Sequence, residues 1–298
     1  MRASIVALTL ITSLGLAAAS RAEDAFGPVA VEPAAQTFKL GALQLTALRD
    51  AQFVMHNDAK IFGVDTGAAA VGEVLKAHGL PDDRITLSVS ALLVRTGHRL
   101  VLLDSGLGPK AHGVLLASVK AAGLSPDAVT DVVITHSHFD HVGGLLDADG
   151  KLAFPKATIR MAAAEWEWMK TQPNAAELVK AIDGHVTPFT PGKPIAPGIT
   201  PIALDGHTPG HAGYEIVSGK MRLLDIGDMA HSSVISLAKP DWKMGFDKDA
   251  ALANATRRAT LARLAKDQEW VFAPHFPFPG VGHVAVEGDG FVWKPGTP

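Results

Sequence analysis

The stretch Thr135-His136-Ser137-His138-Phe139-Asp140-His141 follows directly on the β-branched run Val132-Val133-Ile134. The run predicts a buried strand, and because side chains alternate along a strand, His136 and His138 can project to the same side at its end. Asp140 and His141 lie beyond the strand, where the chain turns before Val142-Gly143-Gly144. Four good ligands for a divalent cation within six residues predict a metal site, and one such loop can supply two neighbouring metal pockets.

The surrounding sequence predicts an α/β fold in which strands and helices alternate. A strand-like run extends from Phe38 to Ala47, and Thr96-Gly97-His98 separates two apolar runs as a hairpin turn would. Ser125 and Pro126 are typical of a helix start, as its cap and its first residue. We expect further strands at 85–94, 100–103, 132–134, 199–204, 214–217, 221–224 and 270–273, and helices at 114–122, 162–169, 175–182 and 248–266.

Composition narrows the class of protein and of site. The chain has 298 residues, of which 47% are hydrophobic, so a large core can be buried without disulfides. The net charge is −3 and no basic block occurs, which argues against nucleic acid as a partner. There is no cysteine, so any metal site must be built from histidine and carboxylate side chains.

Residues 1–22 are interpreted as a signal peptide that is removed on export. Arg2 precedes an apolar segment from Ile5 to Ala19, and Ser20-Arg21-Ala22 offers small residues at the −3 and −1 positions of a cleavage site. The segment is shorter than the roughly twenty residues that span a bilayer, so we expect no stable membrane anchor. We predict a flexible arm at 23–37, one domain at 38–298 and a periplasmic location.

The H-x-H-x-D-H pattern at residues 136–141 resembles the signature of the metallo-β-lactamase superfamily. That resemblance implies a four-layer αββα sandwich with two divalent metal ions at one edge of the sheets. It implies His136, His138 and His207 as ligands of one metal, Asp140, His141 and His275 as ligands of the other, and Asp228 as the bridge. Asp104 and His211 are expected to orient ligands by hydrogen bonds. The ligand types favour Zn²⁺ and also suit Mn²⁺, Fe²⁺ or Co²⁺.

The same resemblance implies a hydrolase that uses a metal-activated hydroxide as its nucleophile, with Asp140 or Asp228 available to accept a proton. The tail from Ala273 to His283 is similar to that of the exported methyl parathion hydrolase group, which favours an aryl phosphotriester as substrate. A lactone, including an acyl-homoserine lactone, is the alternative, although His231 stands where lactonases of the superfamily carry tyrosine. A non-catalytic metal-binding or partner-binding protein on the same scaffold is a third interpretation.

We expect a small-molecule ester-type substrate, and the sequence leaves a homodimer open. Aromatic side chains suit a pocket for an apolar group. The candidates for this pocket, each of which could equally pack in the core or hold a loop carbonyl, are Trp166, Trp168, His231, Phe276 and Phe278.

Overall fold

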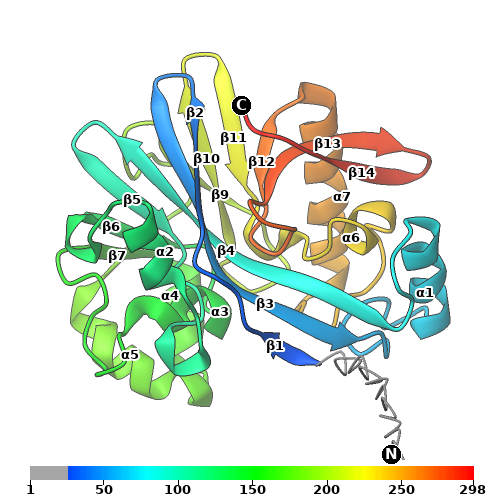
Figure 1. The fold of residues 1–298 in the computed structure, drawn as a ribbon, viewed down its shortest axis with the longest axis horizontal. Helices are drawn as coiled ribbons and strands as arrows, with labels where there is room; N and C mark the ends of the chain where they lie inside the picture. The colour runs from blue at the N-terminus through cyan, green and yellow to red at the C-terminus, as the bar shows by residue number, and fades with distance from the viewer. Residues whose placement is uncertain (1–25) are drawn as a thin grey trace, which may run out of the picture.

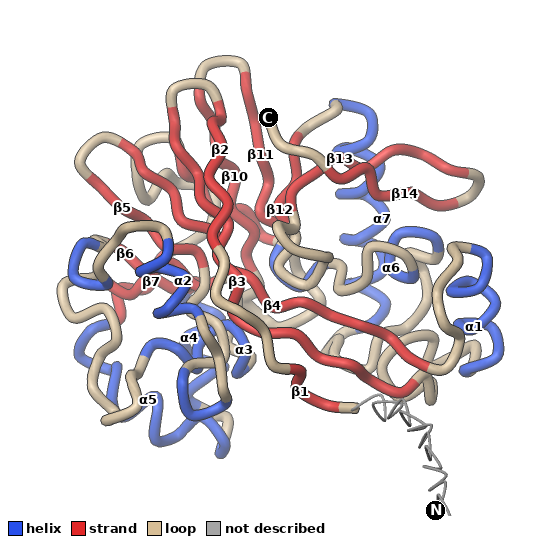
Figure 2. Tube along the Cα trace, in the orientation of Figure 1, coloured by secondary structure: helices blue, strands red, loops and turns tan. Residues whose placement is uncertain are grey.

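A computed structural model describes residues 26–298, so the leader predicted at residues 1–22 lies outside the described part of the chain. Two β-sheets face each other in the middle of the molecule, and helices cover both outer sides (Figure 1 and Figure 2). The four-layer α/β/β/α arrangement implied by the sequence is therefore confirmed.

The first sheet has the order β1-β3-β4-β5-β6-β7-β8, and β2 pairs with β3 beside this path. Its strands are β1 (Gly27–Val29), β2 (Ala35–Leu40), β3 (Leu43–His56), β4 (Arg84–Thr96), β5 (Arg99–Leu103), β6 (Asp131–Ile134), β7 (Thr158–Ala162) and β8 (Val186–Phe189). The second sheet has the order β14-β13-β12-β11-β10-β9. Its strands are β9 (Ile199–Ala203), β10 (Ala212–Ser218), β11 (Met221–Asp225), β12 (Trp270–Phe272), β13 (Val281–Glu287) and β14 (Gly290–Pro295).

The helices lie between these strands in the sequence. The α-helices are α1 (Ala68–Ala77), α2 (Leu115–Ala121), α3 (Phe139–Val142), α4 (Ala163–Lys170), α5 (Ala176–Ile182), α6 (Ile235–Ala238) and α7 (Ala250–Asp267). Short 3₁₀ turns occur at Pro109–Ala111, Pro126–Ala128, Gly143–Leu145, Pro173–Ala175, Asp183–His185 and Gly227–Met229. Within residues 26–298, no helix has both the length and the apolar character needed to cross a membrane.

Alternating side chains explain the layers. In β6, Val132 and Ile134 pack with α2, α4 and α5, whereas Val133 joins the apolar cluster between the two sheets. In β11, Leu223 points into that same central cluster, and Leu224 packs against α7 on the far side. Both faces of each central strand are therefore buried, which accounts for the continuous apolar runs in the sequence.

The carboxyl ends of several strands meet at one edge of the sandwich. β5 and β6 are parallel, and so are β11 and β12. β9 runs in the same direction as β11, because each is antiparallel to β10. The loops that follow β6, β9, β11 and β12 carry all seven predicted metal ligands to this edge.

The structure corrects the sequence interpretation at both ends of the described chain. The run from Phe38 to Ala47 is two antiparallel strands joined by a turn in which Gly41 has φ +58°. The arm expected at 23–37 instead contributes β1 and the start of β2, because the long strand β3 offers paired backbone positions to both. The terminal hairpin β13–β14 was not predicted, whereas the cap at Ser125, whose hydroxyl accepts from the Asp127 N–H, is confirmed.

Candidate metal centre

Asp104, which follows β5, holds the loop after β6 in place by hydrogen bonds. Its carboxylate accepts hydrogen bonds from the Thr135 N–H at 2.8 Å and the Thr135 hydroxyl at 2.9 Å. The carboxylate oxygen that accepts from the Thr135 hydroxyl, Oδ2 of Asp104, also lies 2.7 Å from Nδ1 of His141. That contact leaves Nε2 of His141 free to face the other candidate ligands, which is the usual way in which a carboxylate orients a metal-binding histidine.

Three histidines and Asp228 form one compact group. Nε2 of His207 lies 3.2 Å from Nε2 of His136 and 3.0 Å from Nδ1 of His138. The Asp228 Oδ2 atom lies 3.3 Å from the same His207 nitrogen and 3.5 Å from Nε2 of His136. All four ligand atoms fall within 4.8 Å of one another. We name this group the three-histidine cluster.

Asp140, His141 and His275 form a second group beside the first. Nε2 of His141 is 3.3 Å from Nε2 of His275, and both lie within 3.7 Å of Asp140 Oδ2. Oδ1 of Asp228 is 3.1 Å from the His141 nitrogen and 3.0 Å from the His275 nitrogen. Asp228 therefore contacts both groups, one oxygen to each. We name the second group the two-histidine cluster.

The donor set fits two divalent cations. Ring nitrogens that face each other at about 3 Å cannot all carry protons, so several lone pairs converge without a donor between them. Oδ1 of Asp228 is buried and has no hydrogen bond, which is costly unless something positive binds there. Histidine and carboxylate ligands in this number suit Zn²⁺, and the arrangement does not distinguish it from Mn²⁺, Fe²⁺ or Co²⁺.

Protonation separates the histidines into two kinds. Burial lowers the pKa of His136 well below its ordinary value and that of His138 to about 3, so both rings are neutral near pH 7. Burial opposes protonation of His141 and His207 as well, but Asp228 and the neighbouring carboxylates outweigh it and raise both pKa values. For Asp228 the surrounding imidazoles, led by His141, overcome burial and hold its pKa well below the usual range.

His211 supports the bridging carboxylate from behind. Its Nδ1 faces the Leu204 carbonyl at 2.9 Å, and its Nε2 accepts a hydrogen bond from the backbone N–H of Asp228 at 3.0 Å. Burial lowers the pKa of His211 to about 3, which suits a neutral ring that accepts. The structure thus places His211 outside both clusters and against the turn that carries Asp228.

A buried arginine, Arg257, connects His207 to the turn that carries Asp228. The sequence analysis missed it. Arg257 on α7 is completely buried; it donates from Nε to the Met229 carbonyl at 2.7 Å and pairs with Asp247 at 2.8 Å. The other Asp247 oxygen lies 2.9 Å from Nδ1 of His207. Arg257 also follows Ala253 and precedes Leu261 by four residues each, on the buried stripe of α7. A charge within an apolar helical stripe was the available signal.

The sequence analysis also missed Glu165 on α4, an acid that is fully buried. It lies four residues before Met169, on the face of α4 that packs into the core. Its carboxylate contacts the loops that carry His136, His138 and His207, as described below.

The predicted aromatic pocket residues are divided by the structure. Trp168 is half-buried and its ring lies 6.0 Å from that of His138. Trp166, two residues earlier on the same helix, packs in the core cluster at the first sheet instead, because helix positions two apart face different directions. Phe276 is fully buried against Trp293, and Phe278 lines a separate hollow that His275 also borders. None of these four aromatic residues lines the cavity over the two clusters.

A cavity of about 380 Å³ opens directly onto both clusters. Its polar side is formed by site residues, with His231 among them and both ring nitrogens of that histidine buried without a hydrogen bond. The rest of its wall is apolar and comes from residues that the sequence did not single out, namely Phe53, Met55, Leu87, Leu107, Phe139 and Phe246. Its volume is in the range of small-molecule sites.

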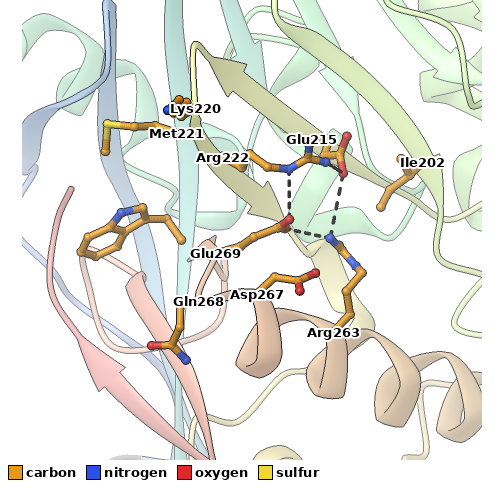
Figure 3. A pocket seen from close by; sticks show the side chains of 10 residues that line it. Ile202, Glu215, Lys220, Met221, Arg222, Arg263, Asp267, Gln268 and Glu269 are labelled. Carbon is orange, nitrogen blue, oxygen red and sulfur yellow. Dashed lines mark hydrogen bonds and ion pairs between the residues drawn. The ribbon is translucent and has the colours of Figure 1, made fainter.

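A wider surface hollow of about 770 Å³ lies elsewhere, over the second sheet and the end of α7. Figure 3 shows that four of its charged side chains point toward one another: Arg222 and Arg263 both pair with Glu269 and also contact Glu215. None of the candidate metal ligands lines this hollow. These four charges are paired with one another, whereas candidate metal ligands face the cavity over the two clusters.

The comparisons with known proteins agree with this geometry. The sequence profile described as "Metallo-beta-lactamase superfamily" matches residues 84–275, which include all seven candidate ligands and most of the chain. The chain belongs to the metallo-β-lactamase superfamily.

Relatives within the superfamily are metal-dependent hydrolases. A probable metallo-hydrolase of Mycobacterium tuberculosis is 27% identical over 183 residues, which cover 48% of this chain and 57% of that protein. The chain thus spans just over half the length of this curated relative. The structure of AidC, a dizinc quorum-quenching lactonase in complex with the product N-hexanoyl-L-homoserine, has a TM-score of 0.83 at 30% identity, covering 89% of this chain and 98% of AidC. The hydrolase AbOPH has a TM-score of 0.81 at 29% identity, with the same two coverages.

Metal affinity should fall as the pH falls. His141, His207 and His275 have raised pKa values, so they hold protons at pH values where ordinary histidines have lost them. A cation that binds their facing nitrogens must displace those protons, which weakens binding about tenfold per pH unit for each proton displaced. Competition with a chromophoric chelator between about pH 8 and about pH 6 measures this. A pH-independent affinity would contradict the assignment of these rings as ligands.

Proposed function

We propose that this chain is a dinuclear-metal-dependent hydrolase of small ester-type substrates, with a lactone that carries an apolar chain as the favoured substrate. The observation that carries the proposal is the position of the two clusters on the polar side of an otherwise apolar cavity. A substrate can bury its apolar part against Phe53, Met55 and Leu87 while its ester bond faces the ligands. A purely structural metal site would not need an open cavity of this size.

The chemistry assigned to the site divides between the metals and the protein. Two divalent cations held by the clusters would activate a water molecule near neutral pH and polarise the ester oxygen. The protein supplies the carboxylate of Asp140, whose side chain is 29% exposed and reaches the cavity, as a group that can accept and return a proton. Asp228 is more deeply buried and contacts four of the candidate ligand histidines, so its part is to hold the two clusters together.

Lactone and aryl phosphotriester remain the two substrate classes to compare. The lactonase AidC supports a lactone, and its similarity extends over most of both chains. The aromatic walls at Phe139 and Phe246, and the tail from Ala273 to His283 that resembles the methyl parathion hydrolase group, favour an aryl phosphotriester as second candidate. Both substrates present a polar oxygen to the metals and an apolar group to the cavity, so one site can take either.

A paired assay separates these classes. We expect the Zn²⁺-loaded chain to hydrolyse lactones with a higher kcat/KM than aryl phosphotriesters, and to lose both activities in chelator. His207→Ala and Asp228→Ala should lower kcat/KM by at least about 10³-fold. His283→Ala serves as a matched control, because that ring contacts the Glu269 carbonyl and lies outside the clusters. A preference for phosphotriesters would reverse the two candidates, and full turnover in both ligand variants would refute the hydrolytic site.

His231 is proposed as a hydrogen-bond donor to the substrate's ester oxygen. Its ring lines the cavity, is buried, and lies between Phe246 and the stacked ring of His275. Although Nε2 is 3.0 Å from Oδ2 of Asp228, neither ring nitrogen has a hydrogen bond of proper geometry, so a substrate oxygen can take one.

Replacing His231 by Leu should lower kcat by about 10- to 100-fold, since one directed donor is lost, while two metals remain bound. Steady-state kinetics and metal analysis of the same preparation test this together. An unchanged kcat, or a loss of metal that explains the whole effect, would remove His231 from the reaction.

A further inference from the structure

Glu165 joins two loops that are far apart in the sequence. One carboxylate oxygen accepts from the backbone N–H of Ser137 at 2.8 Å and from its hydroxyl at 2.7 Å. The other accepts from the Thr208 hydroxyl at 2.7 Å and from the backbone N–H of Gly210 at 3.0 Å. The side chain is completely buried, and all four donors are neutral groups.

The two loops carry the three histidines of the three-histidine cluster. Ser137 lies between His136 and His138, and Thr208 directly follows His207. The second loop approaches α4 so closely that a Cβ atom on Gly210 would lie 2.2 Å from the backbone nitrogen of Glu165. The single carboxylate of Glu165 therefore sets the distance between the two loops, and with it the spacing of the three histidines.

Core packing alone does not account for a charged group at this position. A buried carboxylate is costly unless its oxygens are hydrogen-bonded, and the partners of Glu165 are neutral backbone and hydroxyl donors. Four converging donors, however, need an acceptor with about four lone-pair sites, and only a carboxylate supplies them. A glutamine of the same shape would turn its NH₂ group toward the donors of one loop.

The two-histidine cluster is held by different contacts. His141 is oriented by Asp104, and Nδ1 of His275 faces the Ser88 carbonyl at 2.7 Å. Neither contact involves α4. A change at Glu165 should therefore act first on one cluster and leave the other in place.

We propose that Glu165 is a positioning residue that sets the spacing of His136, His138 and His207 before a cation binds. This inference rests on the metal-binding part of the proposed function and not on the identity of the substrate. It assigns Glu165 no contact with substrate. Its effect is transmitted through the Ser137 and Thr208–Gly210 loops.

The test measures binding of Zn²⁺ alone, so that a failure of the hydrolase proposal leaves it intact. In Glu165→Gln we expect one of the two Zn²⁺ affinities to fall by about 10- to 100-fold, with the other nearly unchanged. Co²⁺ substitution should show the same loss as a change in the visible absorption of one site. Glu167→Gln is the matched control, since Glu167 lies on the same helix, is exposed and pairs with Lys170.

Thr208→Val keeps the inference testable if Glu165→Gln does not fold, because it removes one donor to the same carboxylate without changing the shape of the side chain. A smaller selective loss of one Zn²⁺ site is expected there. Two wild-type affinities in a folded variant would overturn the proposal. So would an equal weakening of both sites that parallels a fall in the thermal stability of the metal-free protein, because that result indicates a structural role only.

Discussion

The carboxylate of Asp228 lies between five histidine rings, and the arrangement of the whole edge depends on this contact. One oxygen faces His141 and His275, and the other faces His136, His207 and His231. These residues come from loops after four different strands, β6, β9, β11 and β12, so their approach requires the two sheets to be packed against each other in one fixed position. The apolar cluster between the sheets fixes that position. The lone pairs and carboxylate charges that converge at this edge repel one another, and bound cations would relieve that repulsion.

Buried acids behind the ligands do much of the positioning. Asp104 orients His141, Asp247 orients His207, and Glu165 spans the two loops of the three-histidine cluster. Each of these acids has its oxygens hydrogen-bonded, and Asp247 also pairs with the buried guanidinium of Arg257. Because these contacts exist only in the folded chain, metal binding and stability of the fold are expected to be coupled.

How much the sequence could predict follows from how local each signal is. The candidate ligands at 136–141 are adjacent in the chain, and His207, Asp228 and His275 each follow a recognisable strand, so pattern and resemblance together named the side chains that the fold brings together. Glu165 and Arg257 act through contacts that only the folded chain creates, although each was visible as a charge on an apolar helical face. For Trp166, Trp168, Phe276 and Phe278 the sequence left core and pocket open, because an aromatic residue suits both, and none of the four lines the cavity. Strand pairing of residues 27–29 and 281–295 depends on neighbours that no local pattern specifies.

A dinuclear metal centre built from seven side chains is the central claim, and the metal content of the purified chain tests it most directly. The purified chain would be saturated with Zn²⁺, freed of excess metal and analysed for zinc and protein by elemental analysis. We predict about two zinc ions per chain in the wild type, and a clear loss when Asp228 is replaced by Ala. A wild-type chain that retains no zinc, or only one ion that is unaffected by the loss of Asp228, would contradict the account.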